Sequence, residues 1–369
     1  MPNNAPHLTI VIPNRNRELR TVERSLKSLF GQNTEHVEVF LIDYGSLIPY
    51  QEKLRELLKK FPQVCAIFCP VQGQLWNKSR AINIVLRQCA TPYFMVADMD
   101  MIYHPDFIPT VLGMLDPDAV FYFPVGVLRE EESKKDLAFS DYEVKFVTNE
   151  EATGMTLFPT EKLLGINGYD EFYHGWGSED TDVHVRLHHA GTNVIFKKRE
   201  LLLLHQWHPK IYRGKDSTEA FHGTLERINA RYLKLTRKLK IVEANRNSND
   251  NGKKWGIRPD EKAYKKLENP DLVLKLHHTY DDIAAFCFQL QDLNGHCLKI
   301  TITESPEKND PKNKLKRILG KKTPLFCSSE ESNERLLEML IGHLKNCPYR
   351  YTFDRKDGEI KLMILLSEE

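Results

Sequence analysis

Short apolar runs alternate with stretches of helical periodicity between Leu8 and about Pro124, and no other feature of the sequence constrains the fold as strongly. Such an alternation is typical of βαβ units, so it predicts an α/β fold built on a mainly parallel sheet flanked by helices. The predicted strands are residues 8–12, 37–43, 64–69, 93–97 and 119–124. The predicted helices are an amphipathic pattern that ends at Gly31 and the segments 50–60, 77–88 and 105–115.

In open α/β sheets, ligands bind beyond the carboxyl ends of the strands, so the residues that follow each strand are the first candidates for a site. These segments are residues 13–17, 43–46, 70–80 and 98–101. Polar and charged side chains gather in all four. The sequence therefore predicts a polar ligand at this edge of the sheet.

A change in composition after residue 243 predicts a second domain. Residues 1–243 are expected to form the catalytic domain, and the polar segment 244–270 is interpreted as a linker. Residues 271–369 are predicted to form a small α+β domain of unknown role. Its expected elements are strands near 271–277, 284–290, 297–302 and 359–366 and a helix at 332–345.

The charges of the chain are balanced, with 52 Lys and Arg against 51 Asp and Glu. No overall field therefore attracts nucleic acid, and any phosphate must be bound locally. No apolar run approaches the roughly 18 residues that span a bilayer, so no transmembrane segment is expected. Most of the seven cysteines lie in apolar runs, which favours reduced thiols in a cytoplasmic protein. A peripheral position at the inner membrane face is the alternative left open.

Two carboxylates, Asp98 and Asp100, directly follow the predicted strand at 93–97. Hard oxygen ligands suit Mg²⁺ or Mn²⁺, which are commonly held by one or two carboxylates together with substrate phosphates. His205 and His208 follow a run of leucines, and an imidazole that joined the carboxylates would shift the preference toward Mn²⁺. Taken alone, such carboxylates and histidines are as often solvated or packed groups, so both interpretations stay open on the residues alone.

A second pair of carboxylates, Glu179 and Asp180, falls in the first turn of a predicted helix with Ser178 as its N-cap. The helix dipole and the free backbone N–H groups keep a carboxylate ionised there. Ordinary helix-start charge is one interpretation. The other depends on the preceding Gly175-Trp176-Gly177 turn, which sets an aromatic face beside the carboxylates, and such faces pack well on the C–H faces of sugars.

Residues 7–210 resemble the GT-A glycosyltransferases, family 2-like, of the β-1,4-galactosyltransferase and chondroitin polymerase kind. Ile12-Pro13-Asn14-Arg15-Asn16-Arg17 resembles their nucleotide-binding first loop, and Trp76-Asn77-Lys78-Ser79-Arg80-Ala81-Ile82-Asn83 resembles their helix with a basic residue followed by Asn. Asp98-Met99-Asp100 is similar to their metal motif. Gly175-Trp176-Gly177-Ser178-Glu179-Asp180-Thr181-Asp182 is similar to their donor and acceptor motif.

The resemblance implies a role for each matched residue. The implied nucleotide-sugar-binding residues are Pro13, Arg15, Arg17, Asp43, Arg80, Asp98, Trp176 and Gly177. The implied ligands of a Mn²⁺ or Mg²⁺ ion are Asp100 and His205, with Asp98 as a ribose or metal contact and His208 as the alternative histidine. Glu179 would bind the donor sugar, and Asp180 would deprotonate the acceptor hydroxyl.

Two positions depart from the family pattern. Many relatives carry two adjacent aspartates where this chain has Ile42-Asp43-Tyr44, which leaves the uracil contact of Asp43 open. Ser178 replaces a glycine of close galactosyltransferases, which leaves the donor sugar open.

Residues and resemblance together predict an inverting, metal-dependent hexosyltransferase of polysaccharide biosynthesis that moves galactose or N-acetylgalactosamine from a UDP-sugar to a glycan hydroxyl. The expected partners are the UDP-sugar and a glycan acceptor, free or lipid-linked, and the C-terminal domain is expected to serve acceptor docking or oligomer assembly. A catalytically silent carbohydrate-binding or scaffold protein on the same fold is one alternative. A sugar nucleotidyltransferase is disfavoured, because it needs a Gly-rich loop after the first strand and residues 13–17 contain no glycine.

Overall fold

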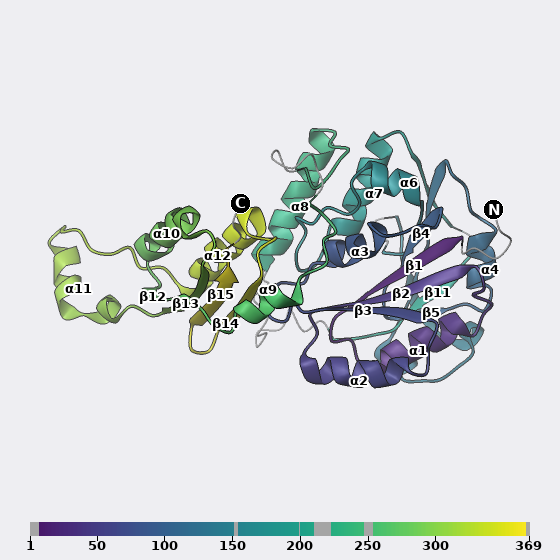
Figure 1. The fold of residues 1–369 in the computed structure, drawn as a ribbon, viewed down its shortest axis with the longest axis horizontal. Coiled ribbons are helices and arrows are strands. Elements are labelled where there is room, and N and C mark those ends of the chain that lie inside the picture. The colour runs from purple at the N-terminus through teal and green to yellow at the C-terminus, as the bar shows by residue number, and fades with distance from the viewer. Residues whose placement is uncertain (1–6, 151–153, 199, 210–222, 247–253, 367–369) are drawn as a thin grey trace. The chain divides into compact units, whose positions relative to one another are not determined.

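The structure, a computed structural model, describes residues 7–150, 154–198, 200–209, 223–246 and 254–366 (Figure 1). The chain divides into two compact units, each of several segments. The first unit comprises Met1–Cys69, Trp76–Pro209 and Glu226–Arg258. The second unit comprises Pro70–Leu75, Lys210–Leu225 and Pro259–Glu369.

Seven strands form the main sheet of the first unit in the order β10-β6-β9-β4-β1-β2-β3. They are β1 (Leu8–Asn14), β2 (Val37–Tyr44), β3 (Val64–Cys69), β4 (Tyr93–Val96), β6 (Ala119–Tyr122), β9 (Thr156–Pro159) and β10 (Asn193–Phe196). All neighbours are parallel except β9, which runs antiparallel to both β4 and β6. The predicted mainly parallel α/β sheet is confirmed.

The apolar runs revealed these strands because the sheet is covered on both faces. Every residue of β1 is buried, and strands buried on both faces appear in sequence as nearly continuous apolar runs. In Figure 1, α1 and α2 lie below the strands, and α3, α6 and α7 lie above them.

Five helices before residue 258 were predicted: α1 (Leu19–Phe30), α2 (Ile48–Leu58), α3 (Lys78–Leu86), α4 (Phe107–Leu112) and α7 (Glu179–His189). Helices α5 (Glu130–Ser133), α6 (Thr160–Gly165) and α8 (Gly223–Lys238) and the 3₁₀ turn η1 (Phe139–Asp141) were not predicted. Helix α1 buries Val22, Leu26 and Leu29 against the sheet and ends at Gly31, as its periodicity predicts.

A second, four-stranded sheet of the first unit was not predicted from the sequence. Its strands are β5 (Met101–Tyr103), β7 (Gly126–Leu128), β8 (Val144–Val147) and β11 (Leu203–His205), in the order β5-β11-β7-β8. Strands β11 and β5 pair antiparallel with His205 opposite Met101. The backbone N–H of Gln206 continues this pairing by donating to the carbonyl of Asp100 at 2.9 Å. This register brings residues a hundred positions apart in sequence side by side.

The second unit is a smaller α+β structure, as predicted. Its sheet, in the order β12-β13-β15-β14, consists of β12 (Leu272–His277), β13 (Cys297–Thr303), β14 (Tyr349–Asp354) and β15 (Glu359–Leu365). Its helices are α9 (Glu261–Lys266), α10 (Tyr280–Gln289), α11 (Pro311–Ile318) and α12 (Ser329–His343), with the 3₁₀ turns η3 (Leu290–Leu293) and η4 (Pro306–Asn309).

The prediction of a strand at 284–290 is wrong, because these residues lie in α10 and at the start of η3. The Thr279 side chain accepts a hydrogen bond from the backbone N–H of Asp282 and starts the helix, whose Ile283 and Phe286 are buried. Short apolar runs cannot be assigned to strand or helix by periodicity alone, and here the N-cap decides. The strand β14 was not predicted, although its buried Tyr349, Tyr351 and Phe353 alternate with more exposed residues.

Residues 70–75, which lie between β3 and α3 in sequence, belong to the second unit. The carbonyl of Gly73 accepts from the backbone N–H of Tyr351 at 2.9 Å. Gln74 Nε2 donates to the carbonyl of Cys347 at 3.1 Å, and the backbone N–H of Leu75 donates to Tyr349 Oη at 3.2 Å. The second unit therefore includes a segment that lies far upstream of its other strands in sequence.

The segment 244–270, predicted to be a linker, is divided between the two units. Trp255 is buried in the first unit, where it lies against the guanidinium of Arg87. Helix α9, with its buried Tyr264, belongs to the second unit. Among the helices of the described residues, none combines the length and the apolar character that crossing a bilayer requires.

Candidate functional site

The loops that follow β1 and β2 are fastened to each other. Asn16 has a φ of 50°, a left-handed conformation that asparagine adopts more readily than most residues. Its backbone N–H donates to Ser46 Oγ at 2.7 Å, and its Oδ1 accepts from the backbone N–H of Leu47 at 2.9 Å. These bonds fix the segment that carries Arg15 and Arg17.

Asp43, the predicted uracil contact, is buried at the end of β2. Its two oxygens accept from Asn14 Nδ2 at 2.8 Å, Ser46 Oγ at 2.5 Å and Gln51 Nε2 at 2.7 Å. These bonds hold the loops after β1 and β2 in place, so Asp43 supports the architecture of the site. Its contact with uracil stays a prediction.

Pro13 and Arg15, both predicted to line the nucleotide region, lie at the end of β1. Pro13 is paired with Ile42 of β2, beyond the last residue of β1 that pairs with β4, so the missing N–H of proline costs no bond to β4. Arg15 Nη1 is buried and has no hydrogen-bond partner among the described residues. A buried guanidinium nitrogen without an acceptor is costly, which marks Arg15 as a group that needs an anionic or carbonyl partner.

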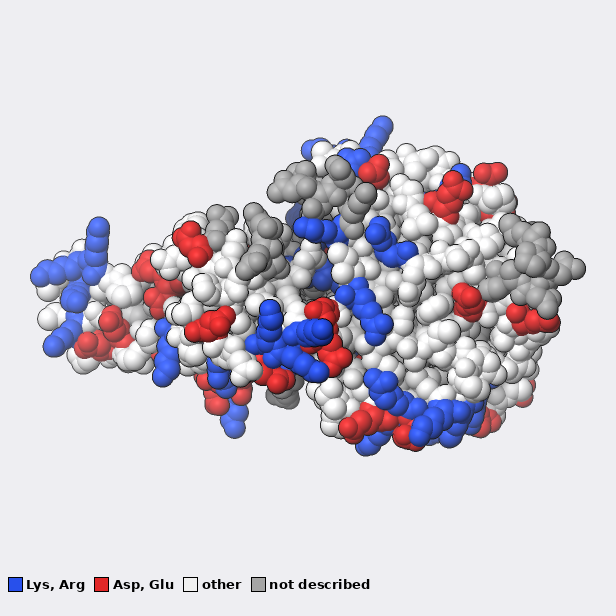
Figure 2. Space-filling view, in the orientation of Figure 1, with Lys and Arg blue, Asp and Glu red and all other residues white. Residues whose placement is uncertain are grey.

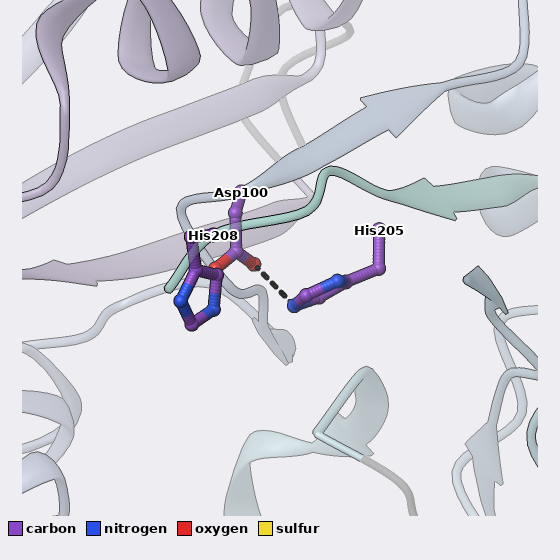
Figure 3. A group of neighbouring side chains, drawn as sticks. All are labelled: Asp100, His205 and His208. Carbon is purple, nitrogen blue, oxygen red and sulfur yellow. Dashed lines mark ion pairs between the residues drawn. The ribbon is translucent and has the colours of Figure 1, made fainter. Parts of the chain in front are cut away.

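Asp100, His205 and His208 form a cluster in which their ligating atoms lie within 4.8 Å of one another. The Nε2 atoms of His205 and His208 lie 3.5 Å from Oδ1 and 3.3 Å from Oδ2 of Asp100. Figure 3 shows both imidazoles beside the carboxylate. The sequence did not decide which histidine joins Asp100, and in the structure both do. The β5–β11 pairing places His205 beside Asp100, and His208 follows three residues later.

Arg17 joins this cluster, with its Nη2 3.0 Å from Oδ2 of Asp100. Asp100 is almost entirely buried, and burial raises the pKa of its carboxyl, but His205, Arg17 and His208 together outweigh burial and hold that pKa below its ordinary value. Burial, and then the Arg17 guanidinium, lower the pKa of His208. An ionised carboxylate and a neutral imidazole are the forms that ligate a divalent cation.

Asp98 does not lie in the Asp100 cluster but pairs with Lys78. Strand β4 ends at Val96, and the chain turns at Met99 and Asp100 before β5 begins, which separates the two carboxylates. Lys78 Nζ lies 2.9 Å from Oδ1 of Asp98 and 3.1 Å from Oδ2 of Asp180. The ammonium group thus bridges the predicted metal motif and the predicted acceptor motif.

Both partners of this bridge have shifted pKa values. Burial alone would lower the pKa of Lys78, but Asp180 and Asp98 raise it well above its ordinary value. Burial, together with the negative charges of Glu179 and Asp98, raises the pKa of Asp180 to about 7 against the opposing charge of Lys78. A carboxylate whose pKa lies near neutrality is suited to accept a proton at physiological pH.

The Gly175-Trp176-Gly177 turn is held from two sides. Its Gly175 N–H donates to the carbonyl of Trp76 at 2.8 Å, which ties it to the start of α3. Asn229 Nδ2 of α8 donates to the carbonyls of His174 and Trp176. Positive φ values of 74° and 97° at the two glycines allow the turn. The Trp176 side chain is half exposed on it.

Helix α7 begins after this turn. Ser178 occupies the N-cap position, but with a φ of 78° and without the predicted side-chain hydrogen bond. Glu179 and Asp180 follow in the first turn, as predicted. Asp182, two residues further along, has a different environment: it is fully buried, and its Oδ2 accepts from Arg186 Nε at 2.6 Å.

Arg80, predicted to bind the nucleotide, is mostly buried in α3. Its Nε donates to Oε2 of Glu171 at 2.8 Å, and Glu171 Oε1 accepts from Asn83 Nδ2 and the backbone N–H of Gly256. These bonds fasten α3 to the segments at 171 and 256. The nucleotide contact of Arg80 stays a prediction.

Two residues of this site were missed in the sequence. Lys78 lies in the same motif as Arg80, which the resemblance singles out as the basic group. The signal for Lys78 is its position as the first residue of α3, directly after the N-cap Asn77. Gly154 gave no signal: a Cβ there would clash with Oδ2 of Asp98, so a side chain at this position would displace the carboxylate that pairs with Lys78.

Two family models match the chain. Residues 9–160 match "Glycosyl transferase family 2", and residues 134–205 match "N-terminal domain of galactosyltransferase". Over 170 residues the chain is 22% identical to chondroitin sulfate synthase 3 of Mus musculus, a match that covers 44% of this chain and 19% of that protein. The chain thus spans about a fifth of the length of this relative.

Solved structures of glycosyltransferases are also similar. A mannosyltransferase of Pyrobaculum calidifontis, solved with GDP-Man and Mn²⁺, has a TM-score of 0.41 at 14% identity, covering 65% of this chain and 73% of that chain. GalNAc-T7, solved with UDP, GalNAc and Mn²⁺, has a TM-score of 0.42 at 14% identity, covering 56% and 45%. The enzyme TarS of S. aureus, solved with UDP-GlcNAc, has a TM-score of 0.46 at 12% identity, covering 65% and 68%.

The two segments that match family models overlap and together span residues 9–205. They include most of β1, Asp100 with His205, and the first turn of α7, whereas His208 lies beyond them. The resemblance of this region to family 2-like glycosyltransferases is therefore confirmed by both family models.

Proposed function

We propose that the chain is an inverting, metal-dependent glycosyltransferase that moves a sugar from a UDP-sugar to a glycan hydroxyl. The observation that carries the proposal is the division of the acidic side chains into two centres, one with histidines and one joined by Lys78. Asp100 with its two histidines forms one centre, and Asp98 with Asp180 forms the other. One centre suits a diphosphate with its cation, and the other suits an acceptor hydroxyl.

The donor set at Asp100 fits a divalent cation. Oδ1 of Asp100 is buried and has no hydrogen-bond partner among the described residues, and the same holds for Nδ1 of His205. One carboxylate with two imidazoles favours Mn²⁺ over Mg²⁺. When bound, such an ion neutralises charge on the leaving diphosphate.

The two arginines of the loop after β1 would bind the diphosphate. Arg17 stands at the Asp100 cluster, and the unpartnered Nη1 of Arg15 lies two residues earlier in the same loop. A guanidinium presents donors in a planar fork that matches phosphate oxygens. Both arginines therefore help orient the donor and stabilise the charge that the leaving group develops.

Asp180 is the proposed general base. Its carboxylate is held against Lys78 at the start of α7, and its pKa of about 7 lets it accept the hydroxyl proton near neutral pH. Direct attack by the deprotonated hydroxyl displaces UDP in a single step. One displacement inverts the anomeric carbon.

The donor sugar would lie between Trp176 and Glu179. The half-exposed indole offers an apolar face for the sugar ring, and the Glu179 carboxylate accepts from sugar hydroxyls. Galactose or N-acetylgalactosamine is the proposed sugar, because residues 134–205 match the galactosyltransferase family model. The acceptor is proposed to be a glycan, as the name of the chondroitin sulfate synthase relative suggests.

A panel of UDP-sugars, assayed for UDP release with and without Mn²⁺, tests the proposal. We expect turnover with one or two donors, loss of turnover in excess EDTA and recovery with Mn²⁺. The Asp100→Ala variant should be inactive, and Asp118→Ala, which removes an exposed aspartate before β6, should be fully active. NMR of the product should show an anomeric configuration opposite to that of the donor.

Three outcomes contradict the proposal. Undiminished turnover in EDTA excludes the metal, and a product with retained configuration excludes the single displacement. No turnover with any donor, combined with specific glycan binding, would identify a carbohydrate-binding protein on this fold.

A further inference from the structure

Residues 311–322 form a strongly basic segment in a chain with a net charge of only +1. Six of these twelve residues are Lys or Arg, and none is acidic. The segment contains α11 and the residues that end it. Figure 2 shows Lys and Arg side chains gathered at the end of the second unit where Figure 1 labels α11.

Helix α11 turns its apolar side chains toward solvent. Leu315, Ile318 and Leu319 recur at i, i+3, i+4 spacing and are 57%, 80% and 60% exposed. Leu319 is part of the last turn, because its N–H donates to the carbonyl of Leu315 at 3.0 Å. An ordinary surface helix buries such a stripe against its own protein.

The buried side of the same helix is polar. Asn313 is 5% exposed, and its Nδ2 donates to the carbonyl of Glu307 at 3.1 Å and to its Oε2 at 3.3 Å. At about 100° per residue, the centre of the apolar stripe lies roughly 180° around the helix from Asn313. The attachment of α11 to η4 therefore leaves the whole apolar stripe facing away from the unit.

Basic residues flank this stripe. Lys312 and Lys316 lie on one side of it, and Lys321 and Lys322 follow the helix end. All four are exposed and form no ion pair with any carboxylate that the structure describes. Gly320, with a φ of 65°, ends the helix, and the N–H of Lys321 donates back to the carbonyl of Lys316 at 2.9 Å. The last two lysines are thereby held next to the stripe.

We propose that residues 311–322 bind the surface of an anionic lipid bilayer, with the leucine and isoleucine side chains inserted at the level of the headgroups and the lysines on the lipid phosphates. This inference does not depend on the proposed catalytic function, because none of these residues belongs to the candidate site. An apolar stripe between basic residues is the pattern of helices that lie in the plane of a membrane interface.

The charge and shape of the segment favour a bilayer over other occupants. A second copy would bring two cationic rims together, which is repulsive. Nucleic acid would pair with the lysines but leave the three apolar side chains in water, since its phosphates need only charge. A protein interface of ordinary size buries about 800 Å² on each partner, far more than a stripe of three side chains offers. A bilayer accepts such a stripe without a matching shape.

Flotation of the full chain with lipid vesicles tests this proposal. We expect binding to phosphatidylcholine vesicles that contain phosphatidylglycerol, weak binding to phosphatidylcholine alone, and weaker binding at high salt because screening reduces the attraction. Each basic residue near an anionic surface contributes about fivefold to binding, so Lys312→Gln/Lys316→Gln should lose about 25-fold. Leu315→Gln/Ile318→Gln should lose at least about tenfold, because the stripe no longer inserts.

The matched control is Lys53→Gln/Lys59→Gln, which removes two exposed charges from and beside α2 and should bind as the parent does. Circular dichroism shows whether each variant keeps its fold. Equal loss in the control, unchanged binding of either α11 variant, or no preference for anionic vesicles would overturn the proposal. So would binding of the parent to a DNA duplex without binding to vesicles, since that result would assign the segment to nucleic acid.

Discussion

Replacement of Lys78 by glutamine should move the pH dependence of transfer. Lys78 Nζ lies 3.1 Å from Oδ2 of Asp180 and opposes the burial that raises the pKa of this carboxyl to about 7. At an effective dielectric constant of about 20, opposite unit charges roughly 3 Å apart attract each other by about 5 kcal/mol. Desolvation of the pair reduces the net effect, and a neighbouring cation typically lowers a carboxyl pKa by about 1–3 units.

Loss of that cation should therefore raise the pKa of Asp180 from about 7 to about 8–10 in Lys78→Gln. The base acts only when it is ionised, so activity is lost as the pH falls through this pKa. At pH 7 the ionised fraction, and with it kcat/KM, should drop by about fivefold to 500-fold. Activity should return in alkaline solution.

The assay is kcat/KM for UDP release across the neutral and alkaline range, in the parent, Lys78→Gln and Lys78→Arg. The arginine variant keeps the positive charge and should keep the parent's midpoint. Thermal unfolding shows that all three proteins are folded. A midpoint in Lys78→Gln equal to that of the parent, or the same loss at every pH, would refute the electrostatic role of Lys78.

Three further predictions follow from the site. Asp180→Asn should lower transfer by about 10²–10⁴-fold at every pH. The same variant should have a higher melting temperature than the parent above pH 7. The folded-state pKa of Asp180, about 7, lies above the ordinary value of 3.8, so the ionised carboxylate destabilises the folded protein. A melting temperature below the parent's would contradict this sign. Asp182→Asn should lower the free energy of unfolding in urea by about 3–5 kcal/mol, since it leaves Arg186 buried without its partner. Arg15→Gln should weaken UDP binding by about tenfold to 100-fold in calorimetry with little change in stability, and equal binding would exclude a phosphate contact.

The parts of the fold that the sequence predicts are those that carry a local hydrophobic pattern. Strands β1 to β4 are runs of apolar residues, and α1 is a clear amphipathic helix, so each carries its own signal. The second sheet carries none, because its strands are three or four residues long and exist only through pairing with distant segments. Helix α10 was predicted wrongly for a different reason. Its apolar run is compatible with a strand or a helix, and the N-cap at Thr279 makes it a helix.

The candidate site divides in the same way. Asp100, His205 and Asp180 were identified from residue type and position, and their roles stay predictions. That His205 and His208 both reach Asp100 depends on the β5–β11 register, which no local pattern encodes. Asp98 was grouped with Asp100 because they are two residues apart, but the bend after β4 sends it to Lys78. Lys78 joins Asp98 and Asp180 only through tertiary contacts, so its position at the start of a helix does not predict this role.

The attachment of residues 70–75 to the second unit has a consequence for how this chain can evolve. Recombination near residue 258 would replace the C-terminal strands. It would leave residues 70–75, which hydrogen-bond to β14, unchanged, because they are encoded far upstream. Gly73 has a φ of 82°, and a Cβ there would stand 3.2 Å from Cβ of Arg350, so the two positions share one small space. We expect relatives to inherit the loop and the C-terminal strands together, with correlated replacements at positions 73 and 350.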